Sequence, residues 1–399
     1  MLELINKANC CGCTACKSIC PKNAIKMQED EEGFLYPVIE QDKCINCGLC
    51  QKVCPILNKV QEVKCEQEAY LINNKDIKVR EQSTSGGAFT AIANYVITNK
   101  GVVYGAAFDD RFNVYHSYIE STNDLEKFRG SKYVQSDLKD TFKEVKSFLD
   151  NNRIVCYSGT PCQIEGLKKY LGKDYDNLIT VDIVCHAVPS PLVWRKYLEY
   201  QQEKLELRNI KRILFRDKRK YGYKYSTMTI EAENKTYNEG VETDPYLRAF
   251  FGDLSDRPSC YECKFKKQNR VSDFTIWDCF IVGDISKKLD DDKGTSRVLI
   301  HTEHGKKIFQ KIKDDFYYKK VSVEILVNNV REMYYSVNKN NKREQFFIDI
   351  NKMDVQQFFK KYFPDNLRVK LERNIRKILV KTGIYSKTKK MVKKIIGKK

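Results

Sequence analysis

The sequence contains no run of apolar residues long enough to cross a bilayer, which argues against a helical membrane-spanning protein. The residues before Cys10 also lack the apolar stretch of a secretory signal, so a secreted, disulfide-stapled domain is not expected. In such a chain, 16 cysteines indicate metal ligation in a reducing compartment. We therefore expect a cytoplasmic globular protein, and 399 residues with 42% hydrophobic side chains predict two or three domains.

Negative charge is scarce near the C-terminus, and this accounts for most of the net charge of +18. Residues 364–399 hold 13 Lys and Arg against Asp365 and Glu372, a net +11 that leaves +7 for the rest. No base-stacking or groove-reading motif accompanies this charge, so a nucleic-acid partner is not expected. Three interpretations of the tail stay open: a solvated helix face, peripheral contact with an anionic membrane, or contact with an acidic redox partner.

Two complete cysteine runs of the bacterial ferredoxin type lie between residues 10 and 54. Each has the form C-x-x-C-x-x-C-x-x-x-C-P, in which three thiolates hold one iron–sulfur cluster and the fourth ligates the other. The predicted ligand sets are therefore crossed: Cys10, Cys13, Cys16 and Cys54 for cluster 1, and Cys44, Cys47, Cys50 and Cys20 for cluster 2. Zinc sites would not need a proline after each fourth cysteine, so we favour two 4Fe–4S clusters.

Strands and helices alternate after a charged linker at residues 59–68. The predicted strands are 69–72, 102–108, 114–119, 154–157 and 178–184. Helices are expected at 137–149, 162–171 and 192–202, and the resulting β-α-β-α order favours parallel strands with their carboxyl ends at one sheet edge. Short strands are expected within 213–237, a helix at 245–251, and helices after residue 341.

A third metal site is predicted at that sheet edge, where the ligand sites of open α/β sheets collect. Cys162 and Cys185 each follow a predicted strand, and Cys260-x-x-Cys263 would complete four thiolates, the usual complement of one 4Fe–4S cluster. Zinc coordination and buried free thiols remain alternatives. Packing or surface positions are assigned to Cys11, Cys65 and Cys156.

Six further motifs support a family resemblance. They are Ser83-Thr84-Ser85-Gly86-Gly87-Ala88-Phe89, Arg129–Ser136, Gly159-Thr160-Pro161-Cys162-Gln163, Asp182-Ile183-Val184-Cys185-His186, Arg257–Cys263 and Lys342-Arg343. In this order they resemble the coenzyme F-420 hydrogenase/dehydrogenase beta-subunit family over about residues 1–350. The resemblance is closest to bacterial members with a fused double-cluster ferredoxin domain, which are often linked to polysaccharide biosynthesis.

The resemblance implies that the chain binds FAD beside its clusters and exchanges electrons with the deazaflavin coenzyme F-420. A flavin meets a physical need, because clusters carry single electrons whereas most organic partners exchange two. Glycines and helix N-terminal amides at residues 83–87 suit its phosphates, although a serine cap with a tight turn is the alternative. The expected cofactor-binding residues are Ser83, Thr84, Ser85, Gly86, Gly87, Lys132 and Asp278.

One segment departs from the family pattern. Similar bacterial proteins have a Gly-Asp-Phe-Trp-Gly-like segment where this chain has Trp277-Asp278-Cys279-Phe280-Ile281. Asp278 is kept, but bulky residues replace both glycines. We expect Trp277 and Ile281 to narrow or reshape the site if the glycines admit a cofactor or substrate.

The expected fold is a multidomain protein of the α+β and α/β classes. A ferredoxin-like domain is predicted at 1–58, a mixed α/β flavin and iron–sulfur domain with halves 69–205 and 206–350, and a basic helical tail at 351–399. The expected function is that of a flavin-dependent iron–sulfur oxidoreductase, acting between a ferredoxin or other redox protein and a two-electron organic partner. That partner would be coenzyme F-420 or a substrate linked to glycan biosynthesis. A non-catalytic electron-transfer adaptor between a ferredoxin and a separate enzyme is the alternative.

Overall fold

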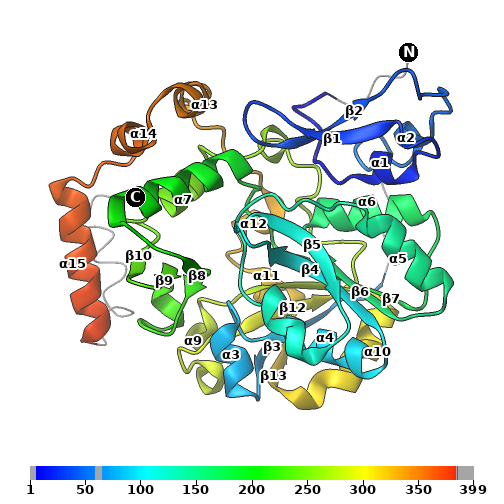
Figure 1. Cartoon of the computed structure of the whole chain (residues 1–399). Coiled ribbons are helices and arrows are strands. Elements are labelled where there is room, and N and C mark those ends of the chain that lie inside the picture. Colours follow the sequence, from blue (N-terminus) through cyan, green and yellow to red (C-terminus); the bar gives the residue numbers. More distant parts are fainter. Residues whose placement is uncertain (1–5, 59–64, 383, 385–399) are drawn as a thin grey trace. The chain divides into compact units, whose positions relative to one another are not determined.

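The computed structural model describes residues 6–58, 65–382 and 384 (Figure 1). These residues belong to two compact units, each assembled from two stretches of chain: 1–191 with 256–338, and 192–255 with 339–399. The linker expected at 59–68 lies largely outside the described residues. Within the described part of the chain, none of the helices combines the length and the apolar character needed to cross a membrane.

An eight-stranded mixed sheet forms the centre of the first unit (Figure 1). Its strands are β3 (Glu68–Asn74), β4 (Val102–Phe108), β5 (Val114–Ile119), β6 (Val155–Gly159), β7 (Leu178–Ile183), β11 (Phe274–Asp278), β12 (Ser296–Ile300) and β13 (Phe316–Val321), in the order β13-β3-β12-β11-β7-β6-β4-β5. Strands β4, β6, β7 and β11 run parallel, and β3 shares their direction because β3 and β11 are both antiparallel to β12. Five carboxyl ends therefore meet at one edge of the sheet.

Helices cover both faces of this sheet. On one face lie α4 (Ala88–Thr98) and α10 (Glu303–Ile312), and on the other lie α5 (Thr141–Asp150), α6 (Pro161–Leu171), α9 (Val282–Ile285) and α11 (Val323–Val327). Successive side chains of a strand alternate between faces, so Val103 packs with α4 while Val102 and Tyr104 pack with α5 and α6. The fold class predicted from the sequence is confirmed.

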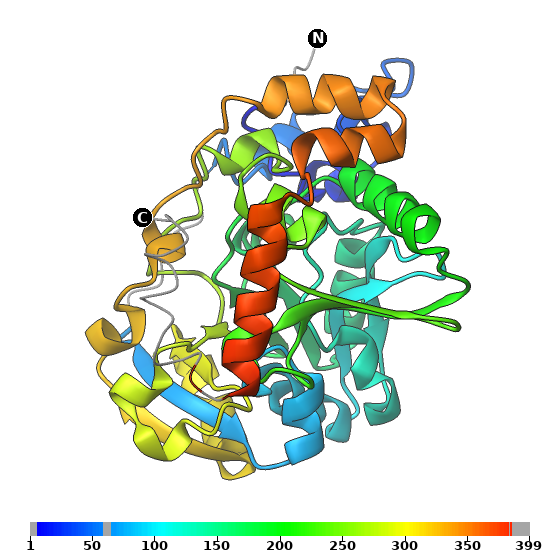
Figure 2. The same ribbon diagram turned by 90° about the vertical axis from the view of Figure 1, so that its left-hand side faces the viewer.

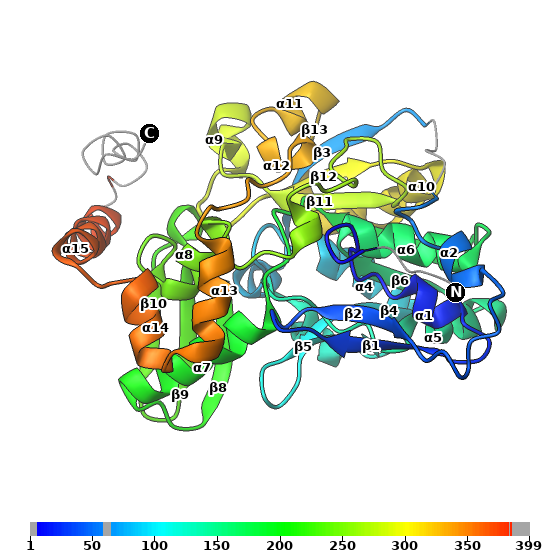
Figure 3. The ribbon, with the colours of Figure 1, turned by 90° about the horizontal axis from the view of Figure 1, so that it is seen from above.

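The N-terminal segment of the first unit has the expected ferredoxin-like form. It consists of α1 (Ala15–Ile19), the hairpin of β1 (Ile25–Glu29) and β2 (Leu35–Ile39), and α2 (Leu49–Lys52). Figures 1 and 3 show it beside α5 and α6, and Ala15 and Val53 share a hydrophobic core with those helices. A Cβ at Gly166 of α6 would lie 2.7 Å from the Cβ of Cys13, so a larger residue at 166 would hold α6 off this loop.

The second unit combines a small sheet with helices. Its elements are α7 (Pro191–Leu205), β8 (Ile210–Asp217), β9 (Thr227–Ala232), β10 (Thr236–Gly240), α8 (Pro245–Phe251), α13 (Arg343–Lys352), α14 (Val355–Tyr362) and α15 (Leu367–Lys381). Aromatic side chains dominate its core: Trp194 and Tyr197 of α7 contact Tyr246 of α8, and Tyr197 also meets Phe359 of α14. Figure 3 shows α13 and α14 beside α7.

Some of the predicted elements have the predicted boundaries, and others begin or end at different residues. The strands at 102–108 and 114–119 and the helix at 245–251 are found with the predicted bounds. The helix predicted from residue 137 begins at Thr141, because the backbone of Asp137 pairs with β5 instead, donating to Val114 O and accepting from His116. The short helix α3 (Ile77–Gln82), which Asp76 caps, was not predicted.

Candidate iron–sulfur and cofactor site

The predicted ligands of cluster 1 line a single pocket in the ferredoxin-like segment. Cys10, Cys13 and Cys16 come from the loop before and into α1, and Cys54 follows α2. Left-handed conformations at Gly12 and Thr14 wind that loop so that the three thiols face one side. Burial raises the pKa of the Cys16 thiol to about 12, and the neighbouring Cys10 and Cys54 add to this shift.

The predicted ligands of cluster 2 line a second pocket. Cys44, Cys47 and Cys50 lie there with Cys20, the fourth cysteine of the other run. Cys50 borders both pockets, so the two sites adjoin. Cys47 is exposed and the neighbouring Ile45 is 57% exposed, whereas Cys10 and Cys13 are buried. Of the two, the cluster 2 pocket is therefore nearer to solvent.

The four cysteines of the predicted third site also lie together. The pKa of Cys185 is raised to about 12, mainly by burial, and Cys162 and Cys263 contribute to this shift. The pKa of Cys260 is raised well above its usual value, first by burial and then by Cys185, Cys263 and Cys162. Four thiols that hinder one another's ionisation need a compensating cation to act as thiolates, which an iron–sulfur cluster or zinc ion supplies.

Backbone pairing explains how loops far apart in sequence form this third set. Cys162 begins α6 directly after β6, and Cys185 follows β7 at the same sheet edge. The chain after Cys185 then pairs with the chain before Cys260, through a bridge between Pro189 and Asp256 and a 2.9 Å bond from Arg257 N–H to Val188 O.

Cys11, expected at a packing or surface position, lies near two predicted cluster ligands. Its thiol lies near those of Cys13 of the cluster 1 set and Cys162 of the third set, and both neighbours perturb its pKa. The cluster 1 pocket and the third set are thus linked by one residue. Nothing in the cysteine spacing marks Cys11, because its neighbour Cys162 lies on another segment.

Basic residues that sequence reasoning missed surround the third set. Lys266 donates hydrogen bonds to the carbonyls of Cys185 and His186, the latter at 2.9 Å, and its charge lowers the pKa of Cys185. Arg270 forms a fully buried ion pair with Asp182 at 3.2 Å and donates to Ile183 O at 2.7 Å. Positive charge beside a thiolate site favours the ionised ligands.

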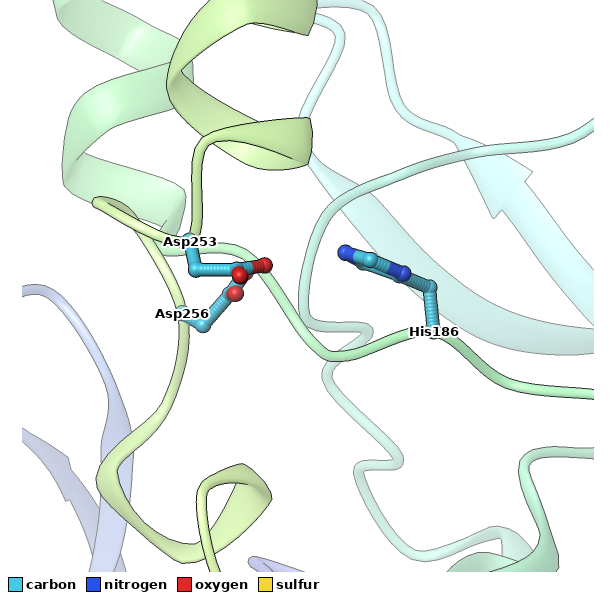
Figure 4. Close-up of side chains that lie close together, drawn as sticks. All are labelled: His186, Asp253 and Asp256. Carbon is cyan, nitrogen blue, oxygen red and sulfur yellow. The ribbon is translucent and has the colours of Figure 1, made fainter. Parts of the chain in front are cut away.

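His186, next to Cys185, lies near carboxylates. Its Nδ1 lies 3.9 Å from Oε1 of Glu332, and this contact contributes most to lowering the pKa of Glu332 to about 2. Figure 4 shows the ring with the Asp256 carboxylate, and the potential metal-ligand atoms of these two residues lie within 4.8 Å of each other.

The Ser83–Gly87 loop lies at the carboxyl edge of the same sheet, between α3 and α4. The Gly86 N–H donates to Ser296 Oγ at 2.8 Å, and Ser85 Oγ donates to Thr295 O at 2.6 Å. A Cβ at Gly86 would lie 2.4 Å from Ile72 O, so only glycine fits. Gly87 precedes α4 in a left-handed conformation and has no side chain to cap the first-turn amides, which leaves them suited to an anion.

Lys132 and Asp278 occupy the same edge. The Thr84 side chain accepts a 2.8 Å hydrogen bond from the Ser131 N–H, which joins the loop to the Lys132 segment. Asp278 ends β11 opposite Ser296, the residue that holds Gly86. Burial lowers the pKa of Lys132 to about 7, and no carboxylate of the described residues pairs with it. The half-buried Nζ of Lys132 donates to the carbonyls of Arg129 and Gly130 at 3.3 and 3.5 Å, and without an anionic partner among the described residues it suits an anionic cofactor group near the uncapped helix.

The bulky residues of the divergent segment pack against one face of the sheet. Trp277 and Ile281 lie against the hydrophobic cluster formed by Leu71, Leu299 and Leu326 on the α9 and α11 face of the sheet. Arg297, opposite Trp277 in β12, also lies 6.0 Å from the Trp277 ring centroid. The expectation that these two side chains narrow a cofactor site stays a prediction.

Comparison with known proteins gives three family matches. The "4Fe-4S dicluster domain" matches residues 9–57. The N-terminal and C-terminal models of "Coenzyme F420 hydrogenase/dehydrogenase, beta subunit" match residues 69–143 and 152–324. No curated protein matches the chain. One similar solved structure is a chain of the F420-reducing [NiFe] hydrogenase complex from Methanosarcina barkeri, at 15% identity and a TM-score of 0.42, covering 76% of this chain and 94% of that chain.

Proposed function

The chain belongs to the coenzyme F420 hydrogenase/dehydrogenase beta-subunit family, and we propose that it is a flavin-dependent iron–sulfur oxidoreductase. Its iron–sulfur redox character follows from the family and from the dicluster domain at residues 9–57. The finer proposal is that it passes electrons between 4Fe–4S clusters and, through FAD, a two-electron organic partner. Such a partner would be a deazaflavin or a substrate linked to glycan biosynthesis.

The observation that carries this proposal is the continuity of the three cysteine sets. The exposed cluster 2 pocket shares Cys50 with the cluster 1 pocket, and Cys11 joins Cys13 of cluster 1 to Cys162 of the third set. A series of ligand sets from the surface to the sheet edge suits transfer of single electrons, for which adjacent centres must lie close together. The exposed end at Cys47 would receive a ferredoxin or another redox protein.

The third set would hold a 4Fe–4S cluster, and the residues around it fit one. Four cysteines are available, and Lys266 and Arg270 supply positive charge near them. Zinc would also accept four thiolates, so metal content decides between the two. We favour iron because Cys11 lies between Cys162 and the cluster 1 ligand Cys13, whereas an isolated structural zinc would need no such neighbour.

The flavin would lie at the same edge of the sheet, where the other expected cofactor residues gather. The amides at the start of α4 and the ammonium of Lys132 would bind its phosphates, while Gly86 and Gly87 keep the loop close to the sheet. A bound flavin supplies the exchange between one-electron and two-electron chemistry that clusters alone cannot perform.

Anaerobic purification with iron, zinc and flavin quantification tests the proposal. We expect about 12 iron atoms and one flavin per chain, which corresponds to three 4Fe–4S clusters. The Lys132→Gln variant should bind flavin roughly 10- to 100-fold more weakly, because a charge-assisted hydrogen bond contributes about 1.5–3 kcal/mol. Lys127→Gln, in the same region but exposed and paired with Asp124 at 2.6 Å, is the matched control. Equal flavin affinity in both variants would show that Lys132 does not bind the flavin.

The alternative of a non-catalytic electron-transfer adaptor rests on the Trp277 and Ile281 replacements. It predicts about 8 iron atoms and no flavin. If the third site contains zinc and the protein binds one flavin per chain, the oxidoreductase proposal stands but the third cluster does not.

A further inference from the structure

The C-terminal helix α15 is the red helix of Figure 2, and several of its apolar side chains are exposed. Leu367, Leu371 and Ile378 are 84%, 62% and 60% exposed. Their spacing of four and seven residues places them on one side of the helix. Large aliphatic side chains are exposed singly on most proteins, but an aligned set marks a binding surface.

Contacts within the second unit fix the opposite side of α15. Arg373 pairs with Glu239 at 2.8 Å, Lys377 pairs with the same carboxylate at 3.3 Å, and Arg376 pairs with Glu242 at 3.1 Å. These contacts, together with Leu379 near Tyr221 and Tyr225, hold one face of the helix against the β9–β10 region. Rotation that would bury the apolar stripe against its own unit would break all of them.

The charge beside the stripe is positive. Lys370 is exposed and lies next to Leu371, and residues 382–399 add seven lysines and no acidic residue to the sequence. The acidic residues near α15, such as Glu239 and Glu242, are already paired with arginines and lysines of its buried face. The exposed side of α15 is thus apolar with Lys370 at its margin, and the sequence that follows the helix is basic.

We propose that α15 and the lysine-rich residues after it bind an anionic lipid bilayer, with the helix lying in the plane of the interface. Aliphatic side chains would enter the boundary between headgroups and acyl chains, while lysines contact anionic headgroups. A second copy of the chain fits less well, because the 15 residues of α15 span about two heptads, fewer than a coiled-coil seam needs. This inference does not depend on the clusters or the flavin.

Sedimentation of the full chain, purified without oxygen, with lipid vesicles tests the inference. We expect binding to vesicles of phosphatidylglycerol and phosphatidylcholine, little binding to phosphatidylcholine alone, and weaker binding as salt rises. The double variant Leu371→Gln with Ile378→Gln should bind at least about tenfold more weakly. Ile325→Gln, a change at a 47% exposed position of α11, is the matched control and should bind as the unchanged protein does.

Circular dichroism and iron content of the variants establish that they fold. Equal binding of the double variant and the unchanged protein would overturn the proposal, as would absence of binding to the anionic vesicles. Light scattering at matched protein concentration measures whether the unchanged protein and the double variant are monomers or dimers. If the unchanged protein is a dimer that the double variant converts to a monomer, the stripe is a contact between two copies and the membrane assignment is wrong.

Discussion

Substitution of Gly166 by alanine should disturb the cluster 1 site from outside its cysteine motifs. The new Cβ would lie 2.7 Å from Cβ and 2.8 Å from Sγ of Cys13. Ordinary non-bonded contacts lie at about 3.5–4.0 Å, so α6 and the Cys13 loop must separate by roughly 1 Å. Overpacking of this kind costs about 1–3 kcal/mol, against a gain of up to about 1 kcal/mol from the better helix propensity of alanine.

Gly172→Ala, at the end of the same helix, is the control. Gly172 has a φ of 69°, and a Cβ added there would have no atom within 4 Å, so alanine would cost about 1–2 kcal/mol of backbone strain without touching a cysteine. Iron content, the electron paramagnetic resonance spectrum of the reduced protein and the unfolding temperature should be measured for both variants. We expect Gly166→Ala to lose about four iron atoms or shift one cluster signal, and Gly172→Ala to lower only the unfolding temperature. Full iron with an unchanged spectrum in Gly166→Ala would refute the packing of α6 on a cluster ligand.

Three further predictions use other parts of the site. Cys162→Ser should lower the iron content by about four atoms while sparing the ferredoxin pair, whereas Cys11→Ser should keep all the iron. Unchanged iron in Cys162→Ser would show that the third site holds no cluster. Lys266→Gln should make the reduction potential of the third cluster more negative, by on the order of 50 mV in a redox titration, because a nearby positive charge stabilises the added electron. An unchanged potential would show that Lys266 does not act on the cluster. Burial lowers the pKa of His116 to about 4, below the value of about 6.5 in the unfolded chain. Between these pH values the unfolded state binds a proton that the folded state does not. The free energy of unfolding should therefore fall by about 3 kcal/mol as the pH drops from about 6.5 to about 4. Denaturant unfolding of His116→Gln should show a smaller loss between these pH values than the unchanged protein, and equal losses would contradict the assignment.

Ligand sets that a short motif encodes could be predicted, because the spacing of neighbouring residues determines their geometry. The crossed cluster sets of residues 10–54 follow from the two runs, and the structure gathers each set in one pocket. The position of Cys162 and Cys185 at one sheet edge also followed from the β-α-β-α order. Both predictions needed only local pattern and the direction of parallel strands.

Residues that act through long-range contacts could not be predicted in this way. Cys11 meets Cys162 across about 150 positions, and Lys266 meets the Cys185 carbonyl from another segment. Neither belongs to a periodic pattern or a spaced motif, so one sequence carries no signal for them. The association of residues 192–255 with 339–399 in one compact unit is another such long-range result, and the domain boundaries expected at 205 and 350 stay a prediction.

Hydrogen bonds join the ferredoxin-like segment to the rest of the first unit. Separating the two would leave buried polar groups without partners. Arg257 is 1% exposed, and its guanidinium donates to Cys10 O at 2.8 Å and Leu35 O at 3.1 Å, with the Tyr36 ring 4.0 Å away. Burying a guanidinium is unfavourable unless acceptors meet it, and here the ferredoxin-like segment provides acceptors for Nε and Nη2. Gln135 makes a similar connection by accepting from the Leu35 N–H at 2.9 Å. The separation of the cluster 1 and third cysteine sets is therefore fixed by the packed structure rather than by a linker, as rapid electron transfer between them would require.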